Sequence, residues 1–538
     1  MKWRLGLIFA TCCLAAQVRP QAPQYGVFEQ VLTAAKPPQD PLAARVRVTF
    51  TSREATETVE AYWDGAAAWK VRYSPMNLGE YAFAVASPDV ELEPRSGAFT
   101  SVPNRGRTAL DRQGPPVVSP NRRHFVHAGS GQPWFWLADT AWSGPMLATT
   151  AEWDEYLATR VKQRFTAVQF VTTQYRAAYA DEQGRTAFQI LEGKLAVDPA
   201  FFSRLDQRVM AMRRAGLVPV AVMLWALSSK VGESPGETLS VAFAAQLARY
   251  IQARYHAFGT IWFLGGDGDY RAEKQDRWKE IGRAVFPADL ARRPVSLHPR
   301  GMQEPWEGLK DEPWLGFLVY QSGHGSSPQK WQWQAWRGPA QGWRLTPPRP
   351  VLDAEPNYEG HVSYQNKLID AFAVRRAAWY ALLSAPLAGV TYGAHGVWPW
   401  MREPGPVLNH PRTGDAPSWR DCMNWPGAQS MKVAADVLAS IAWTTLRPDP
   451  TLAAPNQVVD DFSNYIAAAS SEDLSLALLY LPDNPAASLD LTRFARPVQS
   501  TWVSPSSGAS TPGPRLPAQP AVTVKPPGPG DWLLLLRR

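Results

Sequence analysis

Two acidic residues stand directly after short apolar segments of the sequence. Asp267 follows Thr260–Leu264 and two glycines, and Glu355 follows Pro350–Asp353. A pair of carboxyl groups can cleave a glycosidic bond when one protonates the leaving oxygen and the other attacks the anomeric carbon or activates water. The acid needs a pKa raised by burial and by the other carboxylate, whereas the second group must stay ionised. Asp267 and Glu355 are therefore the candidate catalytic residues.

The sequence leaves alternatives to this assignment open. An Asp at the end of a strand often caps the following helix, so a purely structural role for Asp267 is one of them. Glu355 precedes a proline and fits such a cap less well. Glu359, four residues further on, competes for the catalytic role, and Asp139 fits either a substrate-binding carboxylate or a structural acceptor.

The segments that must position these residues lie between about residues 117 and 445, where short β-branched or aromatic runs alternate with helical patterns such as 152–163 and 201–215. The predicted strands are Phe135–Thr140, Ala167–Val171, Val218–Leu224, Thr260–Leu264, Pro294–His298, Leu315–Tyr320, Pro350–Asp353 and Gly389–Tyr392. Eight strands with intervening helices predict an α/β fold of the (β/α)₈ TIM-barrel type. A doubly wound sheet is the alternative, but no glycine-rich phosphate turn follows the first strand.

In a (β/α)₈ barrel the active site lies at the carboxyl ends of the strands. Strands four and seven, which precede Asp267 and Glu355, face each other across the barrel mouth. Nearly every other predicted strand also ends in a group that can bind a sugar. The predicted substrate-binding residues are Asp139, Trp142, Gln174, His298, Gln321, His324, Tyr358, Glu359, Tyr392, His395 and Trp398.

Tryptophan is abundant, with 24 residues, and the excess clusters at 134–142, 331–343 and 398–425. Indole faces suit the C–H faces of sugar rings, although any single Trp can equally pack the core. Other hydrolytic mechanisms find little support. The histidines form no His-x-x-x-His pair, so neither a metal nor another cofactor is predicted. No Gly-x-Ser-x-Gly turn between a strand and a helix supports a serine nucleophile.

The flanking segments differ from the barrel region. Residues 23–114 predict a small β-sandwich, since Ala44–Phe50 alternates with period two. Residues 446–538 lose the helical pattern and predict a second β-sandwich, and their Pro-, Gly- and Ser-rich stretch 504–529 predicts a loop.

The first 22 residues predict a signal peptide, because Lys2 and Arg4 precede an apolar run that is too short to span a membrane. A buried N-terminal strand is the alternative. The predicted location is secreted or periplasmic, and Cys12 and Cys13 provide only weak support for a lipid anchor. Once this segment is removed, Cys422 is the one cysteine left, so no internal disulfide is expected.

The formal charge of +7 includes Lys2, Arg4 and Arg19, and without them it is +4. Such a weak excess, without a dense Lys/Arg run, does not indicate nucleic-acid binding. No stable membrane insertion is expected either, and the oligomeric state is left open.

Six sequence blocks occur in an order that resembles the apiosidase-like glycoside hydrolases, family 140, over roughly residues 118 to 445. They are Asp139–Trp142, Gly265–Asp267, His298–Gly301, Gln321–His324, Glu355–Gly360 and Tyr392–Trp398. The resemblance implies a (β/α)₈ fold and a retaining mechanism, with Asp267 as general acid/base and Glu355 as nucleophile. The flanks resemble an N-terminal immunoglobulin-like sandwich and a C-terminal β domain of the collagen-binding type, a label that we do not extend to function.

The best-known activity of that family is the release of apiose from a pectin side chain. This sequence departs from the family at Gly268, where an Arg is expected after the Asp, and in its Trp-rich insert 331–343. Both differences would alter the pocket, so another pentosidase or glycosidase specificity stays open.

The sequence therefore predicts an exported glycoside hydrolase that acts on an oligo- or polysaccharide substrate. The alternative is a non-catalytic carbohydrate-binding or surface adhesion protein on the same scaffold. A binding protein is expected to lose a catalytic carboxylate, whereas this chain has both Asp267 and Glu355.

Overall fold

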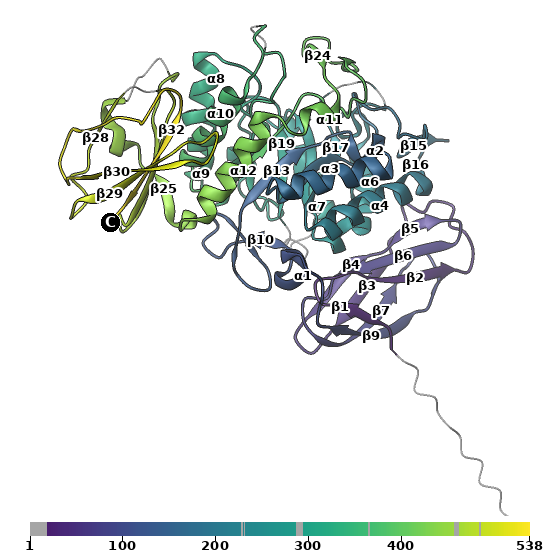
Figure 1. Ribbon diagram of the computed structural model, residues 1–538. Coiled ribbons are helices and arrows are strands. Elements are labelled where there is room, and N and C mark those ends of the chain that lie inside the picture. The colour runs from purple at the N-terminus through teal and green to yellow at the C-terminus, as the bar shows by residue number, and fades with distance from the viewer. Residues whose placement is uncertain are drawn as a thin grey trace, which may run out of the picture.

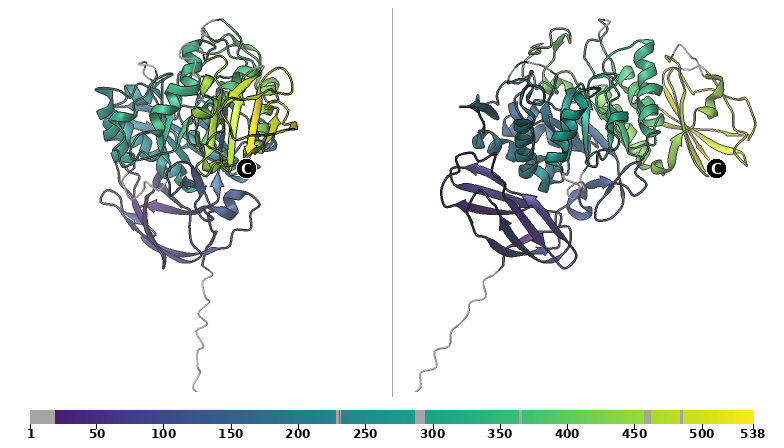
Figure 2. Two further views of the ribbon diagram at one scale, coloured as in Figure 1. Left: turned by 90° about the vertical axis from the view of Figure 1, so that its left-hand side faces the viewer. Right: turned by 180° about the vertical axis from the view of Figure 1, so that it is seen from behind.

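The computed structural model describes residues 19–227, 230, 232–286, 294–363, 366–456, 462–483 and 486–538. A central unit rich in helices lies between an N-terminal β unit, drawn in purple, and a C-terminal β unit, drawn in yellow (Figure 1). The two further views keep this arrangement (Figure 2). Residues 1–18 of the predicted signal segment lie outside the described residues.

The N-terminal unit is a β-sandwich of two sheets, with strand orders β1-β9-β7-β3-β4 and β5-β6-β2-β8. The period-two prediction is confirmed in β3, where Val48 and Phe50 are buried between polar neighbours. β1 pairs in parallel with β9 and buries Ala22, so the sandwich begins before residue 23. Its strands are β1 (Gln21–Pro23), β2 (Phe28–Ala34), β3 (Arg47–Thr51), β4 (Thr56–Glu60), β5 (Tyr62–Gly65), β6 (Ala68–Tyr73), β7 (Gly79–Ala86), β8 (Leu92–Glu93) and β9 (Ser96–Val102).

The central unit contains all eight predicted strands, with ends shifted by a few residues. They are β13 (Trp136–Thr140), β14 (Ala167–Val171), β17 (Val218–Trp225), β18 (Ile261–Gly268), β19 (Val295–Pro299), β20 (Leu318–Tyr320), β21 (Val351–Asp353) and β22 (Gly389–Tyr392). β14 and β17 are buried along their whole length, as expected for parallel strands that are covered on both faces.

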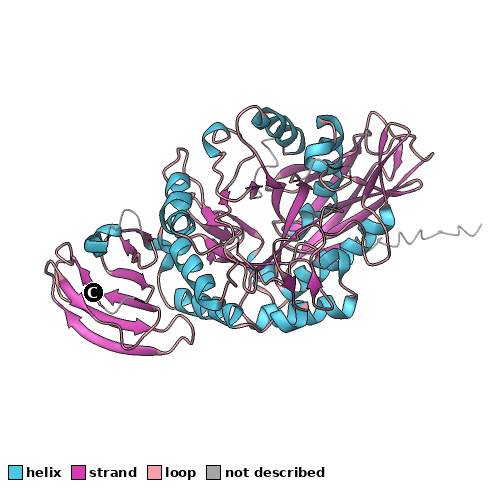
Figure 3. Cartoon of the chain, turned by 90° about the horizontal axis from the view of Figure 1, so that it is seen from above, coloured by secondary structure: helices cyan, strands magenta, loops and turns pink. Residues whose placement is uncertain are grey.

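Six of these strands form one parallel sheet in the order β19-β18-β17-β14-β13-β22, and β20 and β21 form a separate parallel pair. The amide of Gly316, just before β20, donates to the carbonyl of Val295 in β19 at 2.9 Å, which places the pair beside the open edge of the sheet. Seen from above, helices surround the strands (Figure 3). The central unit is therefore a mixed α/β, TIM-barrel-like core.

Several helices of the central unit begin at residues whose side chains cap them. Thr149 and Glu152 form a reciprocal capping box on α3, and Asp198, Ser240 and Asp370 cap α4, α6 and α10. The main helices are α3 (Thr150–Lys162), α4 (Pro199–Ala215), α6 (Val241–Tyr255), α7 (Lys274–Val285), α8 (Pro328–Gln332), α9 (Gly338–Trp343), α10 (Ala371–Leu383) and α12 (Pro426–Ala439). The shorter elements are α1 (Ala109–Gln113), β10 (Pro116–Val118), β11 (Phe125–His127), β12 (Pro133–Trp134), α2 (Gly144–Leu147), β15 (Phe188–Leu191), β16 (Lys194–Val197), α5 (Pro235–Thr238), β23 (Gly405–Pro406), β24 (Asp415–Ala416) and α11 (Trp419–Cys422).

The C-terminal unit has a six-stranded antiparallel sheet, β25-β26-β27-β32-β29-β30, and a smaller pair, β28-β31. Its strands are β25 (Leu446–Pro448), β26 (Ala467–Ser471), β27 (Leu476–Leu481), β28 (Ala487–Leu489), β29 (Val498–Val503), β30 (Ser510–Leu516), β31 (Val522–Val524) and β32 (Trp532–Arg537). The prediction of a loop at 504–529 was wrong, because this segment contains β30 and β31. Proline is tolerated in β30 because that strand lies at the edge of its sheet.

Ion pairs with little exposure to solvent connect each flanking unit to the central unit. Arg72 of β6 donates to Asp206 of α4 at 2.7 Å and to the carbonyl of Arg254 at 3.0 Å. On the other side, Arg375 of α10 makes two hydrogen bonds with Asp531, at 2.9 and 2.8 Å. These contacts lie away from the strand ends that carry the predicted site.

Candidate functional site

A pocket of about 470 Å³ lies at the carboxyl ends of the barrel strands. Asp267 and Glu355 both line it, together with five of the predicted substrate-binding residues. Those five are Trp142, Gln321, His324, Tyr358 and Trp398. The sequence therefore identified a set of residues that the fold brings together.

Glycines shape the chain around Asp267. Asp267 has a φ of +50°, and the register of β18 against β19 is irregular between Phe263 and Gly268. A Cβ at Gly266 would lie 2.5 Å from a methyl carbon of Val222, and one at Gly268 would lie 2.6 Å from the Tyr270 ring. Only glycine fits this close approach of backbone to side chain. The next helix, α7, starts after Glu273, so Asp267 is not its cap.

The Asp267 carboxyl is partly exposed to the pocket, and it forms no hydrogen bond with the described part of the chain. Burial, and then the charge of Glu355, raise the pKa of Asp267 well above its usual range, while Arg300 and Arg176 act in the opposite direction. A carboxyl with few donors and a like charge nearby tends to hold its proton near neutral pH. Asp267 therefore has the surroundings of a general acid.

Glu355 is held by several donors. Gln321 Nε2 donates to its Oε1 at 2.8 Å, His324 Nε2 lies 3.1 Å from the same oxygen, and His298 Nε2 lies 3.5 Å from Oε2. Burial raises the pKa of Glu355 above its usual range, and His298, Tyr358, Gln321 and Lys330 offset part of that rise.

The two carboxyl groups thus differ in their surroundings, because Glu355 has hydrogen-bond donors that Asp267 lacks. Donors that bond a carboxylate favour its ionised form, so this contrast favours ionisation of Glu355 over that of Asp267. Burial and the nearby Lys330 lower the pKa of His324 to about 3, so its imidazole is neutral. A neutral ring that donates to Glu355 must carry its proton on Nε2.

Two predicted substrate-binding carboxylates are corrected by the structure, because neither reaches the pocket. Asp139 is fully buried and accepts hydrogen bonds from Tyr156 Oη and Arg160 Nε, both at 2.6 Å. Glu359 accepts from Tyr392 Oη at 2.6 Å and from the Gly427 amide at 2.9 Å. Asp139 therefore neutralises a buried guanidinium, and Glu359 binds the first turn of α12. Glu359 is no longer a competitor for catalysis.

Four further predictions also need correction, since these side chains lie behind the pocket wall. Gln174 bonds the carbonyl of Phe188 at 2.7 Å and the amide of Ala187 at 2.8 Å. Tyr392 is committed to Glu359, and His395 Nδ1 lies 3.0 Å from the Gly360 carbonyl. His298 does not line the pocket either, although its Nε2 lies 3.5 Å from Glu355 Oε2. Each lies at or after the end of a strand, but its side chain is turned into the surrounding protein.

Four cationic side chains that the sequence did not single out line the pocket: Arg176, Arg300, Lys330 and Arg412. Arg300 donates to the Leu227 carbonyl at 2.9 Å and Lys330 to the Ser322 carbonyl at 3.1 Å. Arg176 and Asn409 bond each other's backbone carbonyls, which joins the segment after β14 to the loop before β24. Among the described residues, no carboxylate lies within ion-pair distance of Arg176, Arg300 or Lys330.

Arg300 could have been identified from the sequence, because it belongs to the block His298–Gly301 and follows His298 by two residues. Arg176 likewise follows Gln174 by two residues. Arg412 and His410 lie on a long connection after β22, for which the sequence offered no indication.

Aromatic rings form much of the remaining wall. Trp142 and Tyr175 pack against Trp225, with ring centroids 5.8 and 5.0 Å apart, and Trp398 packs against His410 at 4.9 Å. Two of the three predicted tryptophan clusters therefore contribute to the pocket. The third, at 331–343, forms the helix after β20, and only Lys330 just before it reaches the lining.

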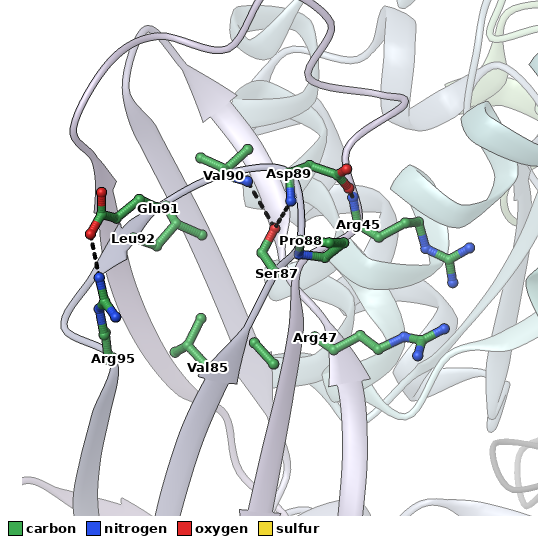
Figure 4. A pocket seen from close by; sticks show the side chains of 11 residues that line it. Arg45, Arg47, Val85, Ser87, Pro88, Asp89, Val90, Glu91, Leu92 and Arg95 are labelled. Carbon is green, nitrogen blue, oxygen red and sulfur yellow. Dashed lines mark hydrogen bonds and ion pairs between the residues drawn. The ribbon is translucent and has the colours of Figure 1, made fainter.

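A larger hollow of about 720 Å³ lies on the N-terminal sandwich, bounded by Arg45, Arg47 and the 85–95 segment. Some of its charged groups already have partners, since Glu91 pairs with Arg95 and Asp89 accepts from the Arg45 backbone amide (Figure 4). It has no aromatic lining and none of the predicted residues, so we assign no chemistry to it.

The described residues contain no group of three or more His, Cys, Asp or Glu side chains placed to hold a metal ion. Within the same part of the chain, no helix is both long enough and apolar enough to cross a membrane.

A barrel-like core with two carboxylates in its mouth is the arrangement found in many glycoside hydrolases. The family model described as the apiosidase-like catalytic domain matches residues 119–445, more than half of the chain. The chain therefore belongs to the apiosidase-like family and is a glycoside hydrolase. Residues 21–88 match a domain of unknown function, DUF5060. No curated protein matches the chain.

Solved structures support the fold. A glycoside hydrolase family 5 protein from Bacteroides vulgatus ATCC 8482 aligns with a TM-score of 0.69 at 19% identity, covering 80% of this chain and 94% of that one. A second B. vulgatus structure, described as a candidate glycoside hydrolase, aligns with a TM-score of 0.72 at 17% identity, covering 97% and 100%. A third, described only as a glycoside hydrolase, has a TM-score of 0.68 at 20% identity and covers 80% and 98%.

Proposed function

We propose that this protein is an exported, retaining glycosidase that removes a sugar from a polysaccharide side chain. The observation that carries the proposal is the contrast between the two pocket carboxyls. Asp267 has no hydrogen-bond donor among the described residues, whereas Glu355 is bonded by Gln321 and His324 and has His298 Nε2 at 3.5 Å. Export rests on the basic and apolar start of the sequence alone.

In the first step, a Glu355 carboxylate oxygen attacks the anomeric carbon while Asp267 gives its proton to the leaving oxygen. The glycosidic C–O bond breaks, and a glycosyl ester with Glu355 forms. In the second step, Asp267, now ionised, takes a proton from water as that water attacks the anomeric carbon. The ester bond breaks, Glu355 regains its charge, and the free sugar keeps its anomeric configuration.

The cations of the pocket support an acidic substrate. Arg176, Arg300 and Lys330 have no carboxylate partner among the described residues, so a substrate carboxylate could bind them without displacing a protein group. A uronic acid next to the released sugar has that charge. This fits apiosidase-like action on a pectin side chain, the activity that the family resemblance implies, while another pentosidase specificity stays an alternative.

The test is a screen of purified protein against pectic and hemicellulosic oligosaccharides, with products identified and their first-formed anomer followed by NMR. Glu355→Gln should abolish turnover while the circular dichroism spectrum stays that of the wild type. Turnover in Glu355→Gln, or a product of inverted configuration, would overturn the proposed mechanism. Binding of an oligosaccharide without turnover by the wild type would instead favour the carbohydrate-binding alternative.

A further inference from the structure

Asp353 is a buried carboxylate that the proposed chemistry does not use. It is the last residue of β21, two residues before Glu355, and its side chain is fully buried. It does not line the pocket, so it cannot touch a bound sugar. Burying a carboxylate costs folding free energy unless hydrogen bonds or a partner charge compensate for the lost hydration.

One oxygen of Asp353 joins the ends of two neighbouring strands. Its Oδ1 accepts the backbone amide of Ser322, just after β20, at 3.2 Å, and the backbone amide of Glu355, just after β21, also at 3.2 Å. Here β20 and β21 have ended, so their own ladder cannot bind these amides. The carboxylate thus replaces strand pairing at the level of the pocket.

The segment held in this way carries the donors of Glu355. Ser322 lies between Gln321 and His324, whose side chains bond Glu355 Oε1 at 2.8 and 3.1 Å. The Gly323 amide also donates to the Glu355 carbonyl at 3.0 Å. The distance between these donors and Glu355 therefore depends on the same backbone contacts that Asp353 fixes.

We propose that Asp353 is a positioning residue for Glu355, which holds Glu355 and the 321–324 segment in register so that Gln321 and His324 stay aligned on Oε1. The inference rests on the proposed role of Glu355 as nucleophile. An error of about 1 Å in the placement of a catalytic group can lower the rate about 100-fold.

The charge of Asp353 is not what this role requires. Burial raises its pKa to about 7, against the hydrogen bonds from Ser322 and the Glu355 amide, and the charge of Glu355 raises it further. The charged or titratable groups around it are Lys330 of α8, Tyr320 of β20 and Glu355 itself. Asparagine keeps an acceptor at the position of Oδ1 without the charge, whereas alanine removes both.

The experiment compares Asp353→Asn with Asp353→Ala, because the two variants lack the same charge and differ in the acceptor. With 4-nitrophenyl glycosides, whose leaving group needs little acid assistance, the rate reports mainly on attack by Glu355. We expect kcat of Asp353→Ala to fall about 10- to 100-fold with KM nearly unchanged, and Asp353→Asn to stay within a few-fold of wild type. The acidic limb of kcat/KM should lie at higher pH in Asp353→Ala than in Asp353→Asn.

A second measurement needs no substrate. The pKa of Glu355, followed by ¹³C NMR titration of labelled carboxyl groups, should be higher in Asp353→Ala than in Asp353→Asn, because misaligned donors stabilise the ionised form less. If the alanine variant does not fold, Asp353→Ser replaces it, since its shorter hydroxyl cannot reach both amides.

The matched control is Asp449→Ala in the C-terminal unit. Asp449 is also a buried carboxylate and accepts from Ser470 Oγ at 2.6 Å, but it touches nothing near Glu355. Its loss should lower the melting temperature without moving the acidic limb or the Glu355 pKa. Equal kcat and equal Glu355 pKa in Asp353→Ala and Asp353→Asn would overturn the positioning role. Activity of Glu355→Gln would instead refute the proposed function.

Discussion

Replacing Asp139 tests whether this carboxylate at the end of β13 has a structural role or binds substrate. Both Asp139 and its partner Arg160 have side chains with 0% exposure, and their Oδ2 and Nε atoms are 2.6 Å apart. Asp139→Ala would leave the guanidinium uncompensated, which costs about 3–5 kcal/mol for a buried pair. With an unfolding entropy of about 2.1 cal/mol/K per residue for the 115–445 unit, the melting temperature should fall by about 4–7 °C.

The assay is a thermal melt together with kcat and KM measured well below the melting transition. We expect the stability loss with a KM close to wild type, because Asp139 does not reach the pocket. The double variant Asp139→Ala/Arg160→Met should recover part of the loss, since it removes both charges. A KM raised tenfold with an unchanged melting temperature would refute the structural role and restore Asp139 as a substrate-binding residue.

Four other predictions follow from the same geometry. Gly266→Ala should lower stability by about 1–3 kcal/mol and disturb the pocket, since its Cβ would lie 2.8 Å from Trp225, and a thermal melt would show it. Asp267→Asn should lower kcat on natural linkages about 10²- to 10⁴-fold. Added azide should restore turnover of aryl glycosides by forming a glycosyl azide. Absence of this rescue would argue against an acid/base role for Asp267. Arg300→Ala should raise KM for uronate-bearing oligosaccharides more than for their reduced, neutral analogues, and equal effects would exclude a contact with the carboxylate. The folded-state pKa of Asp353 is raised from 3.8 to about 7, so its contribution to the free energy of unfolding should be lost as pH rises from about 4 to 7. The melting temperature of Asp353→Asn should therefore depend less on pH over that window than that of the wild type.

The sequence by itself predicted the strands of the central unit and singled out Asp267 and Glu355, two carboxyl groups that line one pocket. The apolar runs that became β14 and β22 have the predicted ends, because buried parallel strands are recognised by a local pattern of residues. Asp267 and Glu355 could be singled out because they follow such runs directly. The glycines around Asp267 were visible, but the clashes that require them at Gly266 and Gly268 depend on Val222 and Tyr270, which only the fold brings near.

Only the tertiary structure decided which way each strand-end side chain points. Asp139 lies in β13 and Trp142 two residues beyond its end, yet Asp139 meets Arg160 in the core while Trp142 faces the pocket. The outcome depends on strand register, local bulges and the helices that pack outside, none of which is encoded within a few neighbouring residues. The cations have the same origin: Arg176 and Arg300 become part of one pocket because separate strand-end loops converge there, and that convergence is a property of the tertiary structure alone.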